Sequence, residues 1–498
     1  QNDGTLFLND PNTTSGMMPS SFFFHQAAEI GLNPSQFLSF IVHRSLEARI
    51  AAHPMGEKHR PLLRALQQSL SARQNQKSSL RRIAVIMGGY SFERHISMES
   101  GRNIYEKLAS SAEFEPIPLF LAGDSKSYRL IEMPIAFMLK DNADDIRAKL
   151  EDFHVHSLLK QIQIESAAWT SVFSAGKALH QPREISLEQL AKEADGVFIA
   201  LHGRPGEDGT LQQDLAAVGL YHNGSLAHSA SITINKYETN RRLRELGFSV
   251  ADHRLVSRNE WEQEPRLAEE LSRDFGLPLI AKPADDGCSA AVRKIKSTEE
   301  LAAFMAAIFR PAGPVSAELM QALRIHENDE FPSKPELLIE RFIDREDADH
   351  FLEITGGMVT HYDAHGQLQY EVFEPSEALA ESEILSLEEK FLAGEGQNLT
   401  PSRFSPKPEE QARISQEVRN TLEAVARALD VTGYCRIDAF VKIWHSGKVE
   451  TVIIEVNSLP GMTPATCIYH QASLNGYKPF EFIREILNFG REQKALNA

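Results

Sequence analysis

The hydrophobic positions of the chain form short continuous runs, separated by longer segments with helical spacing. Residues 82–89 read RIAVIMGG and residues 196–203 read GVFIALHG, and each apolar run ends in glycine. Runs of this length are typical of strands that are buried on both faces of a parallel sheet. The pattern therefore predicts an α/β layer in the first half of the chain. The charged stretch of about 124–190 is expected to be a helical insertion between its strands.

Further apolar runs in the second half predict strands of a different kind of layer. They read LPLIAK, ELLIERFI, YCRIDAFVKI and ETVIIEVNS, and the last two flank a turn at 445–447. Residues 236–246 predict a basic helix, and residues 408–429 predict a long amphipathic one. Proline at the first position of the last helix, after Lys478, marks its start.

Composition and charge narrow the class of protein. The chain has 42% hydrophobic and 24% charged residues, which is ordinary for a globular protein. Its net charge of −17 argues against a nucleic-acid or anionic-membrane partner. Three cysteines without a CxxC pair favour a reducing compartment, so we expect a cytoplasmic location. No secretion signal is found, and no apolar run approaches the roughly 18 residues of a membrane helix.

An internal repeat is the least expected feature. Residues 12–41 align without a gap on residues 457–486, and Asp10 falls on Glu455. The identical positions are Asn12, Gly16, Met17, Pro19, His25, Gln26, Ala27, Gly31, Pro34, Phe37 and Ile41. We therefore expect residues 1–45 to be the remnant of a preceding module, joined by a helical linker (46–80) to a complete second one, as in a tandem protein.

Glu455 and Asn457 are the first candidates for chemistry. They lie two residues apart on a predicted strand, so both point to one face while Val456 points to the core. With Asp438 from the preceding strand they offer three oxygen ligands of the kind that magnesium prefers. The alternative is a pair of polar residues on an exposed strand face. The sequence LPGMT that follows favours the metal site, because Gly461 offers an unhindered backbone N–H.

Two basic residues extend this candidate site. Arg436 precedes Asp438 by two residues, so its guanidinium is expected on the same face, where it either stabilises an oxyanion or pairs with an acid. Lys282 ends an apolar strand before a loop of small residues, an arrangement that can hold nucleotide phosphates. Taken alone, the other charged candidates are ordinary surface residues; they are Lys236, Lys390, Glu340 and Glu346.

Taken in order, these segments resemble the D-alanine–D-alanine ligases of the ATP-grasp superfamily, from about residue 82 to residue 487. The motifs are GGYSFERHIS, LHGRPGEDGTLQ, NKYETNR, AKPADDGCSA, LLIERFIDRE, EEKFL, GYCRID and EVNSLPGMT. The resemblance implies an α/β fold, with α+β character in its ATP-grasp part. It implies an N-terminal Rossmann-like substrate domain (81–228) and two ATP-grasp domains (229–335 and 336–490).

The resemblance also implies roles for individual residues. Those implied to bind ATP are Lys236, Lys282, Ser289, Glu340, Phe342, Ile343, Glu346 and Lys390, the last on a closing loop. Those implied to bind two magnesium ions, or manganese in their place, are Asp438, Glu455 and Asn457. Those implied to act on the substrates are Glu93 at the first ammonium group, His202 near the reacting centre, Arg436 and the Gly461 N–H at the tetrahedral intermediate, and Thr466 at the second carboxylate.

The implied activity joins two D-alanine molecules through an acyl phosphate, for peptidoglycan precursor synthesis. The expected partners are ATP and D-amino acids, with no nucleic acid and no membrane. The expected assembly is a homodimer or a pair with a tandem ATP-grasp module.

Two positions in the substrate pocket depart from the family pattern. Cys288 stands where the family usually has serine, and Phe391 stands where it usually has tyrosine. In the family these two side chains bond with the position of Glu93, so this network is broken or rebuilt here. Phenylalanine at the tyrosine position occurs in members that make D-alanyl-D-lactate. The alternatives are thus a ligase with another second substrate, a non-catalytic nucleotide-binding module, or a ligase for unrelated peptides.

Overall fold

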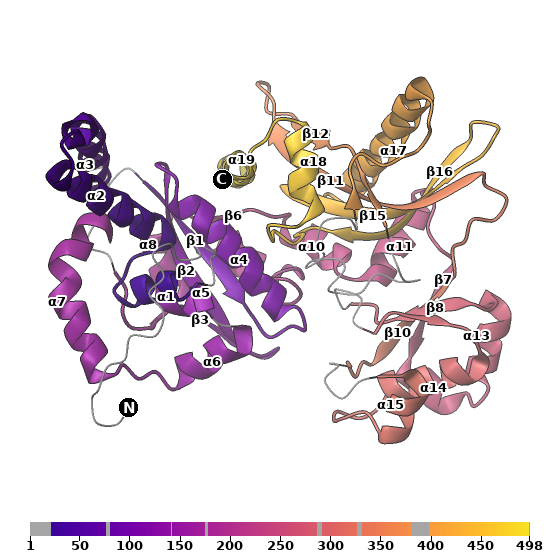
Figure 1. Ribbon diagram of the computed structural model, residues 1–498. Coiled ribbons are helices and arrows are strands. Elements are labelled where there is room, and N and C mark those ends of the chain that lie inside the picture. The colour runs from indigo at the N-terminus through magenta and orange to yellow at the C-terminus, as the bar shows by residue number, and fades with distance from the viewer. Residues whose placement is uncertain are drawn as a thin grey trace. The chain divides into compact units, whose positions relative to one another are not determined.

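The computed structural model describes residues 21–75, 80–140, 142–174, 178–285, 291–325, 331–379 and 398–497 (Figure 1). The chain divides into two compact units. The first consists of Gln1–Arg81, Leu108–Leu119 and Ile131–Glu184, and the second of Arg82–Lys107, Phe120–Leu130 and Ile185–Ala498. The predicted mixed fold class is confirmed, because one sheet contains parallel strand pairs and two other sheets are antiparallel. Among the described residues, no helix is long and apolar enough to cross a membrane.

Helices dominate the first unit. They are α1 (Phe22–Glu29), α2 (Pro34–Ala52), η1 (Gly56–His59), α3 (Arg60–Asn75), α5 (Ile135–Lys140), α6 (Ala143–Glu151) and α7 (Ser157–Ser174). Asn33 and Gln36 form a capping box at the start of α2, which satisfies two backbone N–H groups there. Because α2 runs past residue 45, the boundary expected between a remnant and a linker falls inside a single helix.

The α/β layer is a six-stranded sheet in the order β4-β3-β2-β1-β5-β6. Its strands are β1 (Arg81–Gly88), β2 (Phe114–Gly123), β3 (Tyr128–Glu132), β4 (Arg183–Ile185), β5 (Gly196–Ile199) and β6 (Tyr221–His222). β5 pairs in parallel with β1 and β6, and residues 83–88 are buried, as expected for a strand covered on both faces. The accompanying helices are α4 (Arg94–Ala109), α8 (Leu187–Glu193), α9 (Thr210–Ala217) and α10 (Ala227–Thr233).

The stretch 124–190, predicted to be a helical insertion, is only partly helical. It contains α5, α6 and α7, but β3 and β4 also lie within it and belong to the sheet. Both strands are short, and β4 exposes two of its three residues, so neither presents an apolar run.

An antiparallel sheet in the order β7-β10-β8-β9 follows. Its strands are β7 (His253–Ser257), β8 (Leu279–Lys282), β9 (Arg293–Ile295) and β10 (Glu336–Arg341), with helices α11 (Lys236–Glu245), α12 (Arg258–Gln263), α13 (Leu267–Phe275), α14 (Thr298–Ile308) and α15 (Ala317–Leu323). We expected a domain boundary before residue 336, but β10 pairs with both β7 and β8. The sheets therefore place the division between β10 and β11.

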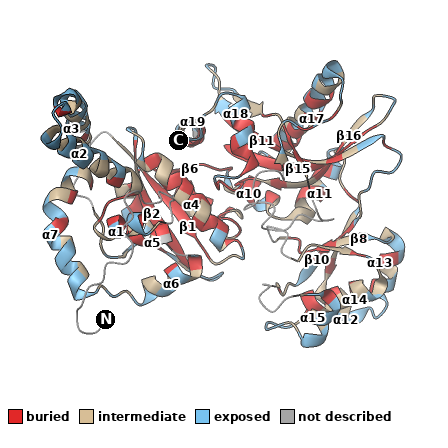
Figure 2. Cartoon of the chain, viewed as in Figure 1, coloured by how far each residue is buried: buried red, intermediate tan, exposed pale blue. Residues whose placement is uncertain are grey.

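The last sheet runs β14-β13-β11-β15-β16, with β12 paired to β11. Its strands are β11 (His350–Tyr362), β12 (Leu368–Val372), β13 (Ser376–Ala378), β14 (Asn398–Leu399), β15 (Tyr434–Ile443) and β16 (Val449–Asn457). The helices of this region are α17 (Pro408–Ala428), α18 (Cys467–Leu474) and α19 (Pro479–Asn497). Figure 2 shows buried residues gathered on the strands and on one side of α17, which packs Ile414, Val418 and Leu422 into the core of this sheet.

The sequence repeat extends to the helices. The alignment of residues 12–41 with 457–486 carries Phe22–Glu29 onto Cys467–Leu474, so α1 and α18 coincide. Continued to residue 52, it carries Pro34–Ala52 onto Pro479–Asn497, so α2 and α19 coincide. The repeated positions before Ser21, including Asp10 and Asn12, lie outside the described residues.

The His222 side chain makes the stability of the fold depend on pH. It lies on β6, and burial lowers its pKa to about 4, compared with about 6.5 for an unperturbed histidine. Between these values the unfolded chain binds a proton that the folded chain does not, so the free energy of unfolding falls as the pH drops from 6.5 toward 4.

We expect this histidine to account for about 2 kcal/mol of lost stability between pH 7 and pH 5. Urea unfolding at both pH values should show that His222→Asn loses about 2 kcal/mol less than the wild type over this interval. The exposed His445, changed to asparagine, is the control and should leave the loss unchanged. Equal losses for wild type and His222→Asn would contradict the assignment.

Candidate active site

A pocket lies between the two antiparallel sheets of the second unit. One wall carries Ile280 and Val292, and the other carries Phe440 and Val452. Charged side chains project among these apolar ones; they are Lys236, Lys282, Glu340, Glu353, Asp438 and Glu455. An apolar slot with a few converging charges is the usual form of a site for a flat ring joined to an anionic group.

Lys282 and Glu340 form a buried ion pair in this pocket. In the antiparallel register Lys282 stands opposite Leu338, so Glu340 is its diagonal neighbour on the same face. The Lys282 ammonium lies 2.7 Å from Glu340 Oε2, and Asn240 Nδ2 donates to Glu340 Oε1 at 2.9 Å. All three side chains are buried, so the carboxylate is fixed by a strand and by helix α11.

The segment after β10 supplies further lining residues. Phe342 and Ile343 both line the pocket, and the Lys294 ammonium lies 4.1 Å from the centre of the Phe342 ring. Glu346, which the resemblance implies to bind ATP, has a φ of 49° and an exposed carboxylate that pairs with the buried Lys442 at 2.9 Å. The structure therefore gives Glu346 a partner of its own on β15.

Four polar residues share one face of the β15–β16 hairpin. Asp438 stands opposite Glu455, and Arg436 stands opposite Asn457. Directly opposite residues point the same way, so these four side chains lie together, as the spacing in the sequence predicted. The register shifts between Asp438 and Ala439, which leaves Ile454 as an extra residue on β16.

Arg436 is the electrostatic centre of that face. Its Nε and Nη2 donate to the two carboxylate oxygens of Asp438 at 3.1 and 3.2 Å, and Nη2 lies 3.9 Å from Glu455. Burial works against the charge, but Asp438 and Glu455 outweigh it, so the pKa of the guanidinium is raised above its ordinary value. Thr355 Oγ1 adds a 2.6 Å hydrogen bond to Asp438 Oδ1.

Lys236 reaches the same carboxylates from helix α11. It is the first residue of that helix, and the Asn235 side chain caps the helix by accepting from two backbone N–H groups. The Lys236 ammonium lies 3.4 Å from Glu455 Oε2, and its backbone N–H donates to Ala284 O at 2.7 Å. A lysine and an arginine thus flank the two acids.

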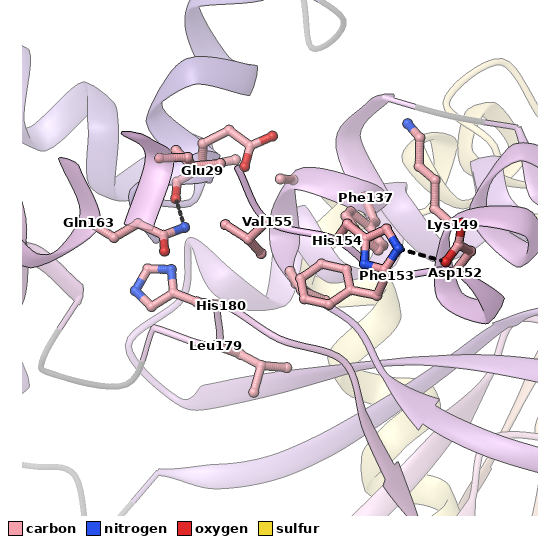
Figure 3. Close-up of a pocket in the computed structure, with 14 residues that line it drawn as sticks. Glu29, Phe137, Lys149, Asp152, Phe153, His154, Val155, Gln163, Leu179 and His180 are labelled. Carbon is pink, nitrogen blue, oxygen red and sulfur yellow. Dashed lines mark hydrogen bonds and ion pairs between the residues drawn. The ribbon is translucent and has the colours of Figure 1, made fainter. Parts of the chain in front are cut away.

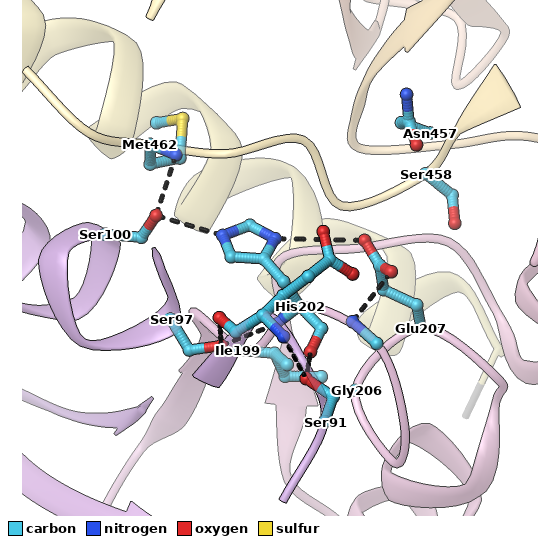
Figure 4. A network of polar contacts seen from close by, with 12 residues as sticks. Ser91, Ser97, Ser100, Ile199, His202, Gly206, Glu207, Asn457, Ser458 and Met462 are labelled. Atoms are coloured by element: carbon cyan, nitrogen blue, oxygen red, sulfur yellow. Dashed lines mark hydrogen bonds and ion pairs between the residues drawn. The ribbon is translucent and has the colours of Figure 1, made fainter. Parts of the chain in front are cut away.

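His202 is the centre of a second polar network (Figure 4). Its Nε2 lies 3.0 Å from Ser100 Oγ, and its Nδ1 lies 3.9 Å from Glu207 Oε1. Its backbone N–H donates to Ser97 Oγ at 2.9 Å, and its carbonyl accepts from Ser91 Oγ at 2.6 Å. The buried imidazole is therefore fixed by both its ring and its backbone.

The segment that contains Gly461 is tied to this network. The Met462 N–H donates to Ser100 Oγ at 3.1 Å, and the Met462 carbonyl accepts from Asn103 Nδ2 at 2.7 Å. Ser100 and Asn103 lie three residues apart on α4, so they face the same side of that helix. Gly461 is buried beside Met462, and the buried Thr466 is the N-cap residue of α18.

The remaining predicted residues are divided between the two networks and the undescribed segments. The side chain of Glu93 is buried on the loop before α4, and its N–H donates to Ser91 Oγ at 3.2 Å. Cys288, Ser289, Lys390 and Phe391 lie outside the described residues.

Four supporting residues were not predicted: Asn240, Thr355, Ser100 and Asn103. Each acts by holding another site residue, and nothing in a single sequence distinguishes such a polar residue from its neighbours. The spacing of Ser97, Ser100 and Asn103 along one helix face is the only available signal.

The donor set of Asp438, Glu455 and Asn457 fits magnesium. Two carboxylates and an amide oxygen are hard ligands, and magnesium is usually held by one or two carboxylates together with substrate phosphates. Among the described residues, no group of three or more His, Cys, Asp or Glu side chains is arranged to hold a metal ion. Because the candidate set has only two carboxylates and one amide, it suits an ion whose remaining ligands are phosphate oxygens and water.

An apolar slot between two antiparallel sheets, lined by two lysines and by paired acids, is the arrangement expected of the ATP-grasp class of ligases. The family comparisons are more specific. The model described as "D-ala D-ala ligase N-terminus" matches residues 82–225, and "D-ala D-ala ligase C-terminus" matches residues 243–327 and 331–488. The chain belongs to the D-alanine–D-alanine ligase family and is an ATP-dependent ligase of that kind. The matches begin at residue 82 and give no support to an N-terminal remnant.

Individual relatives agree with this assignment. D-alanine–D-alanine ligases from Chlorobaculum tepidum and Deinococcus radiodurans are each 25% identical and cover 83% of this chain and 98% and 99% of their own. The solved D-Ala:D-Ser ligase VanG of Enterococcus faecalis shares the fold at a TM-score of 0.55 and 20% identity, over 82% of this chain and 99% of its own. The solved D-alanine–D-alanine ligase of Coxiella burnetii shares the fold at a TM-score of 0.52 and 18% sequence identity, over 84% of this chain and 97% of its own.

Replacing Glu340 by alanine should strongly destabilise the fold, because it leaves the buried Lys282 ammonium without its partner. We expect a loss of about 3–5 kcal/mol in the free energy of unfolding, measured with urea. Glu336→Ala removes an exposed carboxylate from the same strand and should change stability by less than about 0.5 kcal/mol. Similar small losses for both variants would show that the ion pair is not structural.

Proposed function

We propose that this chain uses ATP to join the carboxylate of one D-alanine to the amine of a second, in the cytoplasmic synthesis of peptidoglycan precursors. The observation that carries the proposal is the convergence of Lys236, Arg436, Asp438 and Glu455 beside an apolar slot. The comparison with a D-alanine–D-alanine ligase from Bacillus anthracis complexed with ATP supports a nucleotide in such a fold, at a TM-score of 0.50 and 21% identity, over 84% of this chain and 100% of that one.

The slot holds the nucleotide base and directs its phosphates to the charged residues. Glu340 accepts from the adenine amino group, and the backbone of Phe342 and Ile343 follows the ring edge. Lys282 and Lys236 contact the phosphates. The two lysines are already held by acids, Glu340 and Glu455, so their side chains are oriented for binding.

The first step transfers the γ-phosphoryl group of ATP to the carboxylate of D-alanine. A carboxylate oxygen forms a bond to phosphorus, the bond from phosphorus to ADP breaks, and an acyl phosphate results. Asp438, Glu455 and Asn457 hold the magnesium, which when bound neutralises phosphate charge. The carboxylate of Glu93 binds the ammonium group of this D-alanine.

In the second step the amine of the second D-alanine attacks the acyl carbon. The carbon–nitrogen bond forms, inorganic phosphate leaves, and the amine loses a proton. Arg436 and the backbone N–H of Gly461 stabilise the oxyanion of the tetrahedral intermediate. The hydrogen bonds of Ser100 and Asn103 to Met462 support this role, because they fix the backbone next to Gly461. His202 orients the substrates at the reacting centre, and Thr466 binds the second carboxylate.

A second candidate function is a ligase for a different second substrate. It rests on Cys288 and Phe391, which stand in the sequence where the family usually has serine and tyrosine, and of which cysteine is a weak hydrogen-bond donor and phenylalanine none. The similarity to a D-Ala:D-Ser ligase and to D-alanine–D-alanine ligases at comparable TM-scores is compatible with either substrate.

The two candidates differ in which substrates release phosphate from ATP at neutral pH. If the chain makes D-alanyl-D-alanine, D-alanine alone supports steady phosphate release, and mass spectrometry detects the dipeptide. If the second substrate differs, D-alanine alone is poor, and adding D-lactate or D-serine raises the rate and gives the mixed product. If none of these substrates supports phosphate release, although ATP binding is measurable, both candidate functions are contradicted.

Asp438→Asn and Glu455→Gln should each lower phosphate release by about 100-fold or more, because removing one preorganised transition-state contact has this effect. Raising the magnesium concentration should restore part of the loss for Glu455→Gln. Glu450→Gln is the matched control: it removes a carboxylate from the same strand but keeps an acceptor for Ser249 Oγ, which lies 2.6 Å away. Activity of Asp438→Asn near that of the control would exclude Asp438 as a ligand.

A further inference from the structure

The helix pair α1–α2 and the helix pair α18–α19 are two copies of one element. Their bounds coincide in the gapless alignment, and both copies turn at a glycine with positive φ, Gly31 at 85° and Gly476 at 89°. Phe37 and Phe482 are identical and buried in both copies. The two pairs therefore share their internal packing, and their outer faces can be compared position by position.

The α18–α19 pair buries one face against the last sheet of the second unit. Ile468 and Gln471 approach Gly357 on β11 so closely that a Cβ there would meet them at 2.9 and 2.3 Å. Gln471 Nε2 donates to the backbone of Thr355 at 2.8 Å and to Ser376 Oγ at 2.9 Å. The buried positions of this face are Cys467, Ile468, Gln471, Ile483, Ile486 and Leu487.

The same positions of α1–α2 are apolar except for Gln26, and they are exposed except for the half-buried Ile41. Phe22 is 81% exposed, Phe23 40%, Leu38 43% and Val42 50%, and they align with Cys467, Ile468, Ile483 and Leu487. Gln26 aligns with Gln471 and is exposed. We call Phe22, Phe23, Gln26, Leu38, Ile41 and Val42 the α1–α2 face.

The opposite side of α1–α2 anchors the pair to the first unit. Leu32 is fully buried, and the Phe40 ring stacks on Trp169 of α7 at 4.9 Å. Gln163 Nε2 donates to the carbonyl of Glu29 at the end of α1, at 2.9 Å (Figure 3). In the α18–α19 copy this side carries polar residues such as Lys478, which is exposed at the position of Asn33. The position of Leu32 is occupied there by the half-buried Tyr477, which donates to Glu371 at 2.7 Å, and the position of Phe40 by Glu485, whose side chain is 40% exposed. The aromatic contact that holds the first copy at Phe40 is therefore replaced by a polar residue in the second copy.

We propose that the α1–α2 face docks on the antiparallel sheet of a second ATP-grasp C-terminal domain, one without a terminal helix pair of its own. The residues that α1–α2 shares with α18–α19 favour a β-sheet as the binding surface, rather than a helix or a flat apolar surface. Gln26 stands where Gln471 bonds to strand backbone, and Phe23 stands where Ile468 approaches Gly357 on β11. Clustered exposed apolar side chains of this kind usually mark an interface. Within the described part of the first unit, the main neighbours of α1 and α2 are other helices, namely α3, α5, α7 and η1.

Two other occupants of the α1–α2 face are possible, another part of the same chain and a second copy of the chain. Each can be tested in the intact protein. Oxidative labelling followed by mass spectrometry measures how accessible Phe22 and Phe23 are in the monomer, with buried Phe482 as the reference. Rapid labelling of both is expected. Protection equal to that of Phe482 would mean that the chain covers the face itself and would overturn the proposal. A dimer that Phe23→Asp with Leu38→Asp converts to monomer would assign the face to a second copy and overturn it as well.

The fit to a sheet is tested by a graft within the full chain. Residues 467–497 are replaced by a copy of residues 22–52, which has the same length and helix bounds. The grafted chain should unfold cooperatively. The same graft with Leu38→Asp and Val42→Asp in the copied segment should melt at least about 5 °C lower, because Ile483 and Leu487, the native residues at these two positions, are fully buried. The same two changes in the native α1–α2 should not shift the melting temperature, because both positions are exposed there.

A second graft restores the side-chain sizes of the native pair by adding Phe22→Cys and Phe23→Ile to the copied segment. It removes the possibility that larger aromatic rings alone prevent docking. Either graft melting above its aspartate control supports the proposal. If both grafts melt no higher than their aspartate controls, the α1–α2 face does not fit a sheet of this kind and the proposal fails.

Discussion

The buried pair of Arg436 and Asp438 is the interaction on which the site depends. A guanidinium this far from water is stable only when carboxylates face it, and both oxygens of Asp438 do so, with Glu455 nearby. The alternation of side chains along β15 and β16 places both residues of the pair on the same face as Glu455 and Asn457. Ile453 and Val456 lie three positions apart on β16, so strict alternation would place them on opposite faces. Because Ile454 is an extra residue between them, both remain buried in the core. The hairpin thus has a dry side that holds the fold together and a charged side available for phosphate chemistry.

Much of this arrangement could be predicted from the sequence, because it depends on local periodicity. The period of two placed Glu455 and Asn457 on one face and Val456 in the core, and the apolar runs marked β1, β5, β8 and β10. The bulge could not be predicted, because two adjacent isoleucines look the same whether or not a register shifts between them. The ion pair of Lys282 with Glu340 and the contacts of Ser100 to Met462 join distant segments. Only the folded topology brings such residues together.

The two copies of the helix pair show how one sequence pattern serves different surroundings. Both copies keep the glycine turn and the central phenylalanine, which determine how the two helices pack on each other. The two copies differ in their surroundings: Phe40 of α2 stacks on Trp169, whereas Glu485, at the same position of α19, has a side chain that is 40% exposed. The family matches begin only at residue 82. The α1–α2 pair is therefore identified by the internal alignment and the matching helix bounds, and not by the family assignment.

The central claim is that a carboxylate oxygen of the first substrate attacks the γ-phosphate of ATP, and that this oxygen atom leaves with the inorganic phosphate when the amide bond forms. Supplying D-alanine labelled with ¹⁸O in its carboxylate, and weighing the inorganic phosphate by mass spectrometry, tests this directly. The account predicts one ¹⁸O atom in each phosphate released with the dipeptide. Phosphate without ¹⁸O, formed at the same rate, would show that water or another group attacks phosphorus, and it would contradict the acyl-phosphate route.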